Sequence, residues 1–323
     1  MVLAPGELPS NKITPLFDVR GYFDALREAR KHEEPPTSEK ARDEEGWGLG
    51  EALLYGEVIT STQTMLDKNP HLLNILPSPL LSLATHQLAG RGRGANTWLS
   101  PLGCLQFSLL LHVPLSALPA ARLVFVQYLF ALAVVRACRD PRGLGGDRGA
   151  GVRLKWPNDI YIEMRGGERK KVGGILVHTS FSGGKVDLIV GCGLNVATPA
   201  PLASLAFLAT PGGAPSPEMM LALIMTKFES MWEEFIRARG SWAQFADAYL
   251  DAWMHSDQLV TLTTVTPPRA VRIVGITPDY GLLRTLPERG AWSVGGSADT
   301  GFIDLQPDGN SFDLMAGLIK AKT

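Results

Sequence analysis

The stretch Gly90-Arg91-Gly92-Arg93-Gly94-Ala95-Asn96-Thr97-Trp98 is the segment around which the rest of this sequence is organised. Glycine has no Cβ atom, so the backbone can come close to a ligand. Each guanidinium adds a permanent charge and a planar set of donors that suits carboxylate or phosphate. The stretch lacks the Gly-Lys-Ser/Thr ending of a Walker A loop and the glycine spacing of a dinucleotide fingerprint. It predicts a mobile loop that closes over a polyanion, with a flexible basic surface loop as the alternative.

Length and composition bound the class of protein. The chain has 323 residues, a formal net charge of −1 and 45% hydrophobic residues, which suits one large or two modest globular domains. A net charge near zero argues against a protein that generally coats nucleic acid. The cysteines, Cys104, Cys138 and Cys192, form neither a disulfide framework nor a zinc-ligand pattern. We therefore expect reduced, mostly buried thiols and a cytoplasmic protein.

No segment of the sequence has the pattern of a secretory signal or of a membrane anchor. The first residues lack a basic region followed by an apolar run. The most apolar segment, 123–135, is too short to span a bilayer and is flanked by Arg122 and Arg136. This segment predicts a buried helix, and we expect no membrane partner.

Three regions of the chain differ in texture. Residues 1–50 are polar and irregular, and they predict an N-terminal extension with one amphipathic helix over 18–30 and a linker or exposed loop over 32–50. Residues 51–255 alternate strands with helices. Residues 256–323 become short strands separated by turns, which predicts a small β-rich C-terminal domain.

The middle region carries clear periodic patterns. Strands are predicted at 53–59, 80–88 and 105–113, and helices at 118–139 and 217–240. Ser216 is the predicted cap of the second of these helices, and Ser241 that of a further helix to about residue 255. Residues 139–151, rich in Gly, Arg and Asp, predict a disordered loop.

Polar and glycine-rich segments lie at the ends of the predicted strands, which indicates a single site built on one sheet. They are Ser61–Gln63, Gln87–Trp98, Lys155–Asp159, Lys171–Gly174 and Gly191–Asn195. Together they supply positive charge, glycine backbone and neutral hydrogen-bonding groups. No nucleophile has a clear histidine partner, and the six histidines show no metal spacing. Such a set stabilises anions and positions reactants, and it does not favour a covalent enzyme intermediate.

A carboxylate brought to the α-phosphate of ATP needs this environment, because cations must bridge the two anions. Asp159 is a candidate to help hold Mg²⁺, with a turn cap as the alternative. Lys171 is either such a bridging cation or a solvated lysine at a strand end. Trp156 is expected in the core, whereas Trp98 beside the loop is a candidate to pack an adenine.

The order and spacing of these motifs over roughly residues 53 to 200 resemble the biotin protein ligases (holocarboxylase synthetases), in particular the catalytic region of the eukaryotic type. The resemblance implies an α+β fold. Its catalytic domain is similar to those of class II aminoacyl-tRNA synthetases, with a mixed, largely antiparallel sheet and helices on one side. The β-rich tail is similar to the family's small SH3-like domain.

The resemblance also implies a two-step reaction. Biotin and MgATP give bound biotinyl-5′-AMP and pyrophosphate, and a specific lysine in the carrier domain of a biotin-dependent carboxylase then takes the biotinyl group. The implied cofactors are ATP and Mg²⁺, with biotin as substrate. A lipoate–protein ligase and a catalytically silent module that binds biotin or nucleotide are the alternatives.

The resemblance assigns roles residue by residue. The implied biotin-binding residues are Ser61, Thr62, Gln63, Gln87, Gly90, Arg91 and Gly174. The implied ATP-binding residues are Arg93, Trp98, Lys171 and Asn195. Lys171, Arg91 and Arg93 carry the implied catalytic roles, and Asp159 the implied metal role. Nothing resembles the winged helix of repressor-type ligases, so we expect no DNA partner; a monomer and a homodimer both remain open.

Overall fold

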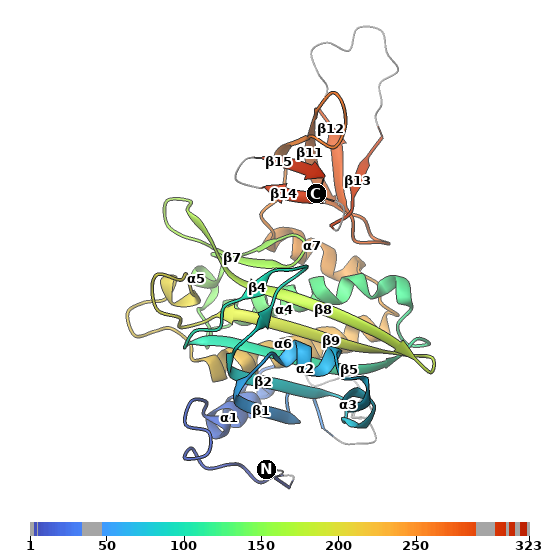
Figure 1. Cartoon of the computed structure of the whole chain (residues 1–323). Helices are drawn as coiled ribbons and strands as arrows, with labels where there is room; N and C mark the ends of the chain where they lie inside the picture. The colour runs from blue at the N-terminus through green and yellow to red at the C-terminus, as the bar shows by residue number, and fades with distance from the viewer. Residues whose placement is uncertain are drawn as a thin grey trace, which may run out of the picture.

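The computed structural model describes residues 3–4, 6–33, 47–288, 301–307, 310–313 and 317–321 (Figure 1). A larger unit is built on one sheet, and a smaller β-rich unit stands beside it at the C-terminal end of the chain. The predicted linker over 32–50 lies mostly outside the described residues.

A seven-stranded sheet forms the centre of the larger unit. Its strands are β1 (Leu53–Ile59), β2 (Leu80–Gln87), β5 (Cys104–Pro114), β6 (Val152–Lys155), β7 (Asp159–Glu163), β8 (Arg169–Ser182) and β9 (Lys185–Asn195). They lie in the order β1-β2-β5-β9-β8-β7-β6. β1 runs parallel to β2, and every other neighbouring pair is antiparallel. The predicted mixed, largely antiparallel sheet is confirmed.

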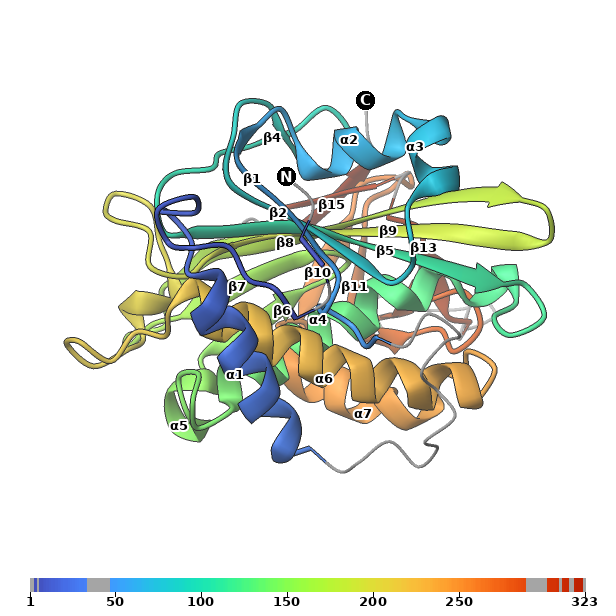
Figure 2. The ribbon, with the colours of Figure 1, turned by 90° about the horizontal axis from the view of Figure 1, so that it is seen from below.

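Helices cover the two faces of this sheet unequally. Four long helices lie on one face: α1 (Val19–Lys31), α4 (Val124–Arg139), α6 (Pro217–Arg237) and α7 (Ala243–Ala252). The short helices α2 (Thr62–Asp67) and α3 (Pro70–Ile75) lie on the other (Figure 2). The implied arrangement, with helices on one side of the sheet, therefore holds only for the long helices. The short helix α2 covers only part of the other face and leaves room there for a site.

The helix α4 is the centre of the core. It follows a 3₁₀ turn, η1 (Ala120–Arg122), and twelve of its 16 residues are buried. By length and composition, Ala120–Arg139 is apolar enough to cross a membrane, but 67% of that apolar window is buried inside the protein. A helix that is hydrophobic all round is typical of a core, and the predicted buried helix is confirmed.

The N-terminal helix belongs to the same core. Asp18 caps α1 by accepting a hydrogen bond from the Gly21 N–H at 2.9 Å. Tyr22 and Leu26 of this helix are buried, and Arg30 reaches Glu229 of α6 at 2.9 Å. The segment predicted as a polar extension over 1–50 therefore contains an integral helix of the larger unit.

Residues 139–151 are ordered, so the predicted disordered loop is wrong. They contain the short helix α5 (Gly146–Gly149). Burial opposes ionisation of Asp140, but hydrogen bonds from Arg142 and Lys227 lower the pKa of its carboxyl to about 2. Lys227 comes from α6, so one partner of this segment lies far away in the sequence. The other interactions are local, among them the Arg142 side chain with Asp140 and the Gly143 N–H to the Asp140 carbonyl at 2.8 Å.

The two helix caps predicted near α6 and α7 have different outcomes. Ser216 caps α6 by accepting from the Met219 N–H at 3.2 Å, as predicted. Gly240, with φ of +77°, follows the end of α6 in a conformation that favours glycine. Ser241 does not cap α7: the N-cap position is Trp242, with no side-chain hydrogen bond.

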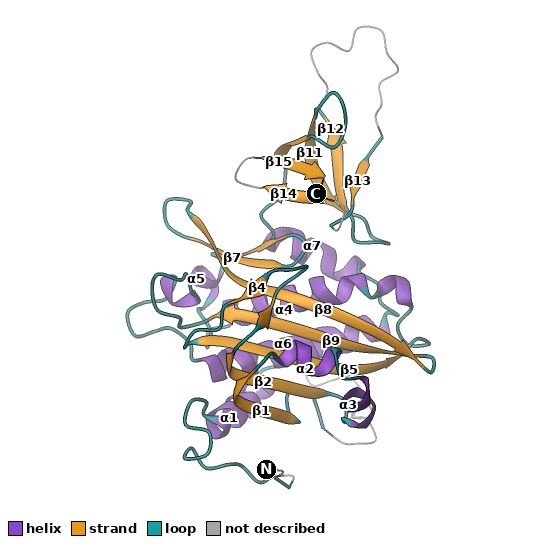
Figure 3. Cartoon of the chain, viewed as in Figure 1, coloured by secondary structure: helices purple, strands orange, loops and turns teal. Residues whose placement is uncertain are grey.

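The C-terminal unit is a six-stranded sheet, which confirms the predicted β-rich tail (Figure 3). Its strands are β10 (Leu259–Leu262), β11 (Arg269–Ile276), β12 (Leu283–Pro287), β13 (Ile303–Leu305), β14 (Asn310–Asp313) and β15 (Leu318–Ala321). Two described contacts join it to α4 and η1. The Tyr128 hydroxyl donates to the Gly281 carbonyl at 2.7 Å, and Arg122 donates to the Pro278 carbonyl at 3.0 Å.

Candidate functional site

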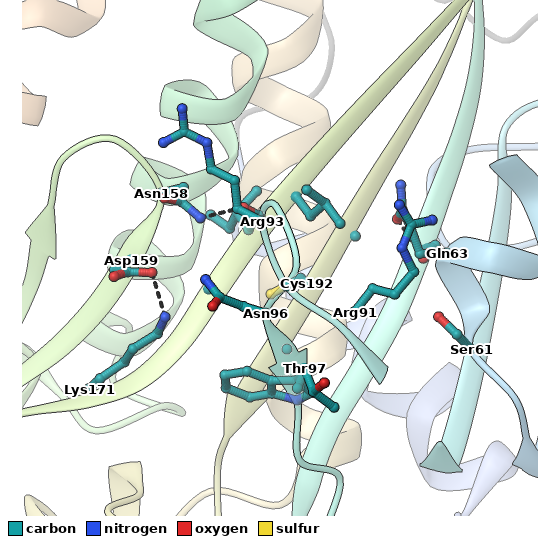
Figure 4. Close-up of a pocket in the computed structure, with 18 of the residues that line it drawn as sticks. Ser61, Gln63, Arg91, Arg93, Asn96, Thr97, Asn158, Asp159, Lys171 and Cys192 are labelled. Carbon is teal, nitrogen blue, oxygen red and sulfur yellow. Dashed lines mark hydrogen bonds and ion pairs between the residues drawn. The ribbon is translucent and has the colours of Figure 1, made fainter. Parts of the chain in front are cut away.

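A cavity of about 480 Å³ opens on the sheet face that carries α2, a volume typical of small-molecule sites. It is bounded by the N-terminal end of α2, by the loop between β3 (Gly90–Arg91) and β4 (Thr97–Trp98), and by the turn between β6 and β7. Residues of β5, of the first half of β8 and of the last part of β9 also line it. The separate polar segments of the sequence therefore meet in one place (Figure 4).

The α2 end of the cavity is a buried network of neutral hydrogen-bonding groups. Ser61 is the N-cap of α2, and its hydroxyl accepts from the Thr64 N–H at 3.3 Å. The Ser108 hydroxyl lies 2.9 Å from Thr62 Oγ1 and 3.1 Å from Gln63 Oε1. The Thr62 N–H donates to the Gln87 side chain at 2.8 Å. Such a network can recognise an uncharged polar head group without supplying a charge.

Two glycines of β9 make the floor of the cavity. A Cβ atom at Gly191 would lie 2.4 Å from Oε1 of Gln63. A Cβ atom at Gly193 would lie 2.5 Å from the Trp98 indole. The Gln63 amide and the Trp98 ring thus occupy space that any other residue would fill, which explains why glycine is needed at both positions.

The β3–β4 loop covers the cavity with two arginines. Few backbone hydrogen bonds hold it, among them the Gly92 N–H to the Asn96 carbonyl at 2.8 Å. Arg91 forms an ion pair with Asp67, the last residue of α2. Figure 4 shows Arg91 extending toward Gln63 and Arg93 toward Asn158, so the two side chains point to different ends of the cavity.

A second ion pair lies at the opposite end. Lys171 Nζ is 2.6 Å from Asp159 Oδ1, and the two side chains are 44% and 19% exposed (Figure 4). Gly174 faces Asp159 in the paired strands β7 and β8. Lys155 also lines the cavity here. This end therefore gathers positive charge around one carboxylate, which suits an anionic ligand.

The β6–β7 turn is held from beneath. The Trp156 backbone N–H donates to His255 Nε2 at 3.0 Å, and its indole N–H donates to the Tyr128 hydroxyl at 2.8 Å. Gln127 of α4 donates to the Pro157 carbonyl at 2.9 Å. Burial lowers the pKa of His255 to about 4, so its ring stays neutral and accepts the Trp156 proton donor at physiological pH. The expected core position of Trp156, 1% exposed, is confirmed.

Most residues named from the sequence line the cavity. They are Ser61, Thr62, Gln63, Gln87, Arg91, Arg93, Trp98, Asp159, Lys171 and Gly174. Gly90 and Asn195 do not line it. Gly90 packs under the Trp98 carbonyl, which a Cβ atom would approach to 2.6 Å. The Asn195 amide is turned away and donates to the Ala203 carbonyl at 3.0 Å.

Sequence reasoning gave no role to some residues that line the cavity. Ser108 is one of them, and its signal in the sequence is a hydroxyl between the apolar residues Phe107 and Leu109 of β5. Pro307 of the C-terminal unit is another, and no local pattern points to it. Cys192 also lines the cavity, but burial raises the pKa of its thiol, which disfavours a nucleophilic role.

Acidic side chains are scarce in the cavity. Asp159 is the single carboxylate among the described residues that line it. Across the described ranges, no group of three or more His, Cys, Asp or Glu side chains gathers to hold a metal ion. The cavity therefore suits binding of anions by cations and dipoles, and any metal here would take most of its ligands from the substrate.

Comparisons with known proteins agree with this arrangement. Residues 55–195 match the model of the biotin/lipoate A/B protein ligase family. A biotin–protein ligase of Schizosaccharomyces pombe is 34% identical over an alignment of 294 residues, and the alignment covers 86% of this chain and 45% of the relative. The biotin–[acetyl-CoA-carboxylase] ligase of Paracoccus denitrificans is 31% identical over 67% of this chain and 84% of its own length.

The fold has solved counterparts. A biotin protein ligase from Aquifex aeolicus, solved in complex with biotin and ATP, superposes with a TM-score of 0.55 at 23% identity, covering 79% of this chain and 95% of that one. This likeness concerns the fold. Since the chain is 31% identical to the Paracoccus relative over 84% of that protein, and its residues 55–195 match the family model, it belongs to the biotin/lipoate A/B protein ligase family.

Proposed function

We propose that this protein is a biotin–protein ligase, which activates biotin with ATP and transfers it to a lysine in the carrier domain of biotin-dependent carboxylases. One observation carries the proposal: a single cavity joins an uncharged hydrogen-bonding network at α2 to a cluster of cations at Lys171. Biotin has the same polarity, with a neutral ureido ring at one end and a carboxylate at the other. The relatives' names support the same substrate.

In the first step, a carboxylate oxygen of biotin attacks the α-phosphorus of ATP, and the bond from that phosphorus to the pyrophosphate oxygen breaks. Two anions must approach each other, so the chain has to supply positive charge. We assign Lys171 to the meeting point of the biotin carboxylate and the α-phosphate, which its position at the charged end of the cavity supports, and Arg93 extends toward the same end. Preorganised cations and donors of this kind lower the barrier without forming a covalent bond to the enzyme.

In the second step, the amine of the acceptor lysine attacks the acyl carbon of biotinyl-5′-AMP. The acyl carbon–oxygen bond breaks, AMP leaves, and the amine loses its proton to solvent. The mixed anhydride must be shielded from water until the acceptor arrives. The β3–β4 loop over the cavity is placed to provide this shield.

Nucleotide and metal would use the charged end of the cavity. We assign Trp98 to the adenine side, while the nucleotide role of Asn195 stays a prediction from the resemblance, because its amide is turned to Ala203. A magnesium ion would neutralise phosphate charge. Asp159 fits as its one protein carboxylate, since Mg²⁺ commonly pairs one or two carboxylates with substrate phosphates.

Further parts of the proposal concern the whole protein. We infer a catalytic unit of the class II aminoacyl-tRNA synthetase type and an SH3-like C-terminal unit, supported by the largely antiparallel sheet and the β-rich tail. We also propose a cytoplasmic location, action without a DNA or membrane partner, and a monomer or homodimer. The chain spans 45% of the S. pombe ligase, so its acceptors are part of the same proposal.

The test is biotin-dependent exchange of labelled pyrophosphate into ATP, with lipoate as a parallel substrate. This assay needs no acceptor protein. Exchange with biotin alone is the expected result. Exchange with lipoate alone would make the protein a lipoate ligase, and absence of exchange despite biotin binding would make it a silent binding module.

A further inference from the structure

We propose that Asp67 is a positioning residue: it docks the β3–β4 loop onto α2 and holds Arg91 at the α2 end of the cavity, where the head group of the substrate would lie. This inference rests on the proposed function for the identity of the substrate. It adds a residue that the cavity lining does not include and that no sequence motif singled out.

The Asp67 carboxylate is almost completely buried, with 1% of its side chain exposed, and Arg91 is its ion-pair partner. Its second oxygen, Oδ1, is buried and makes no hydrogen bond within the described part of the chain. A buried carboxylate is costly unless a cation compensates it. The cost of burying the Asp67 carboxylate therefore favours the state in which the Arg91 guanidinium contacts it.

The geometry leaves Arg91 able to serve a substrate at the same time. The contact to Asp67 uses one terminal nitrogen, Nη1. A guanidinium carries five N–H donors in a fixed planar fork. Because the Arg91 side chain is 36% exposed and lines the cavity, its remaining donors stay available to an acceptor on the substrate.

The helix α2 then joins two parts of the head-group end of the cavity. Its first turn presents Thr62 and Gln63 to the cavity, and its last residue is Asp67. A helix of six residues thus fixes the position of Arg91 relative to the head-group network. Without Asp67, Arg91 would keep its charge but lose this fixed position.

The experiment measures biotin affinity by calorimetry and loop exposure by limited trypsin digestion after Arg91 and Arg93. The variants are Asp67→Asn, Arg91→Ala and the double variant. Asp187→Asn is the matched control, since Asp187 is also a buried aspartate, 6% exposed, paired with His112 at 2.7 Å outside the cavity. We expect Asp67→Asn to weaken biotin binding about tenfold, within the range of coupled side chains. Trypsin should cleave its loop faster, and Asp187→Asn should change neither quantity.

The double variant decides whether Asp67 acts through Arg91. We expect it to bind biotin no more weakly than Arg91→Ala alone. Multiplied effects, or unchanged affinity in Asp67→Asn, would overturn the proposal. If Asp67→Asn fails to fold, Arg91→Gln replaces it in the digestion: faster cleavage at Arg93 supports docking, and unchanged cleavage contradicts it. A parent protein that binds no biotin would overturn the proposed function, while digestion would still test the docking of the loop.

Discussion

The β6–β7 turn and the β3–β4 loop both line the cavity, but the protein holds them very differently. In the turn, the backbone N–H and the indole N–H of Trp156 both have partners in the core, and the Pro157 carbonyl accepts from α4. The loop runs through four consecutive exposed residues, 94–97, with few hydrogen bonds of its own. The β6–β7 turn is thus anchored in the core, whereas the β3–β4 loop lies over the cavity with few contacts that hold it.

This difference separates two tasks that one rigid site could not combine. Reacting groups must be held in a fixed orientation, which favours a turn anchored in the core. Substrates must enter and products must leave, which favours a segment with low local stability. Variants of the turn should therefore change folding and chemistry, whereas variants of the loop should change retention of the intermediate.

The largest effect is expected for Trp156→Ala. The indole is buried beneath the cavity, so its removal leaves a large void and takes away the donor from which the Tyr128 hydroxyl accepts. Loss of about 3–5 kcal/mol of unfolding free energy is typical of such a change. Urea denaturation measures it, with Trp98→Ala as the control from the loop. An equal loss in both variants would remove the contrast between the two segments.

Lys171→Ala should come next. Removing one preorganised cation from the charged end should slow biotin-dependent pyrophosphate exchange on the order of 10²–10³-fold. Biotin binding at the α2 end should change much less. Lys170→Ala is the matched control, because it removes the neighbouring charge, which pairs with Glu168. Exchange at the parental rate in Lys171→Ala would exclude Lys171 from the chemistry.

The anchoring of the turn should depend on pH through His255. Burial lowers the pKa of His255 from 6.5 to about 4 in the folded protein, with further contributions from Lys155 and Arg169. The unfolded chain therefore binds a proton first as the pH falls below about 6.5, and stability is lost down to about pH 4. Between pH 7 and pH 5 we expect a loss of about 2 kcal/mol. Urea titrations at both pH values measure it. The same difference in His255→Asn would assign it to other groups.

The smallest effect on folding is expected for Arg93→Ala. The unfolding free energy should change by no more than about 0.5 kcal/mol, as for most substitutions outside the core. Bound biotinyl-5′-AMP should nevertheless be released or hydrolysed faster, because the loop closes less well. Rapid filtration of the trapped intermediate measures its lifetime, with Arg165→Ala from the exposed β7–β8 turn as the control. A parental lifetime would show that the loop is not the cover.

Local patterns predicted much of this molecule. The bounds of β1 and the Ser216 cap of α6 follow from alternation and capping rules, and the polar segments at strand ends do meet in one cavity. The Ser241 cap is a local miss, since α7 takes Trp242 as its N-cap. Other misses involve partners outside the local segment. The Asn195 amide donates to Ala203, and Asp140 pairs with Lys227 of α6 as well as with Arg142. Asp67 was invisible for the same reason, since its burial depends on the loop that covers it.

A chain of hydrogen bonds from Trp156 through Tyr128 to Gly281 makes the larger unit depend on the C-terminal unit. Gly281 has a φ of +62°, and a Cβ atom there would lie 2.7 Å from the Tyr128 ring, so the C-terminal sheet seats directly on α4. Removal of the C-terminal unit would expose that ring and remove the Gly281 carbonyl to which the Tyr128 hydroxyl donates. The C-terminal sheet therefore helps to hold the β6–β7 turn that lines the cavity. A truncation that removes this sheet should loosen the anchored side of the site.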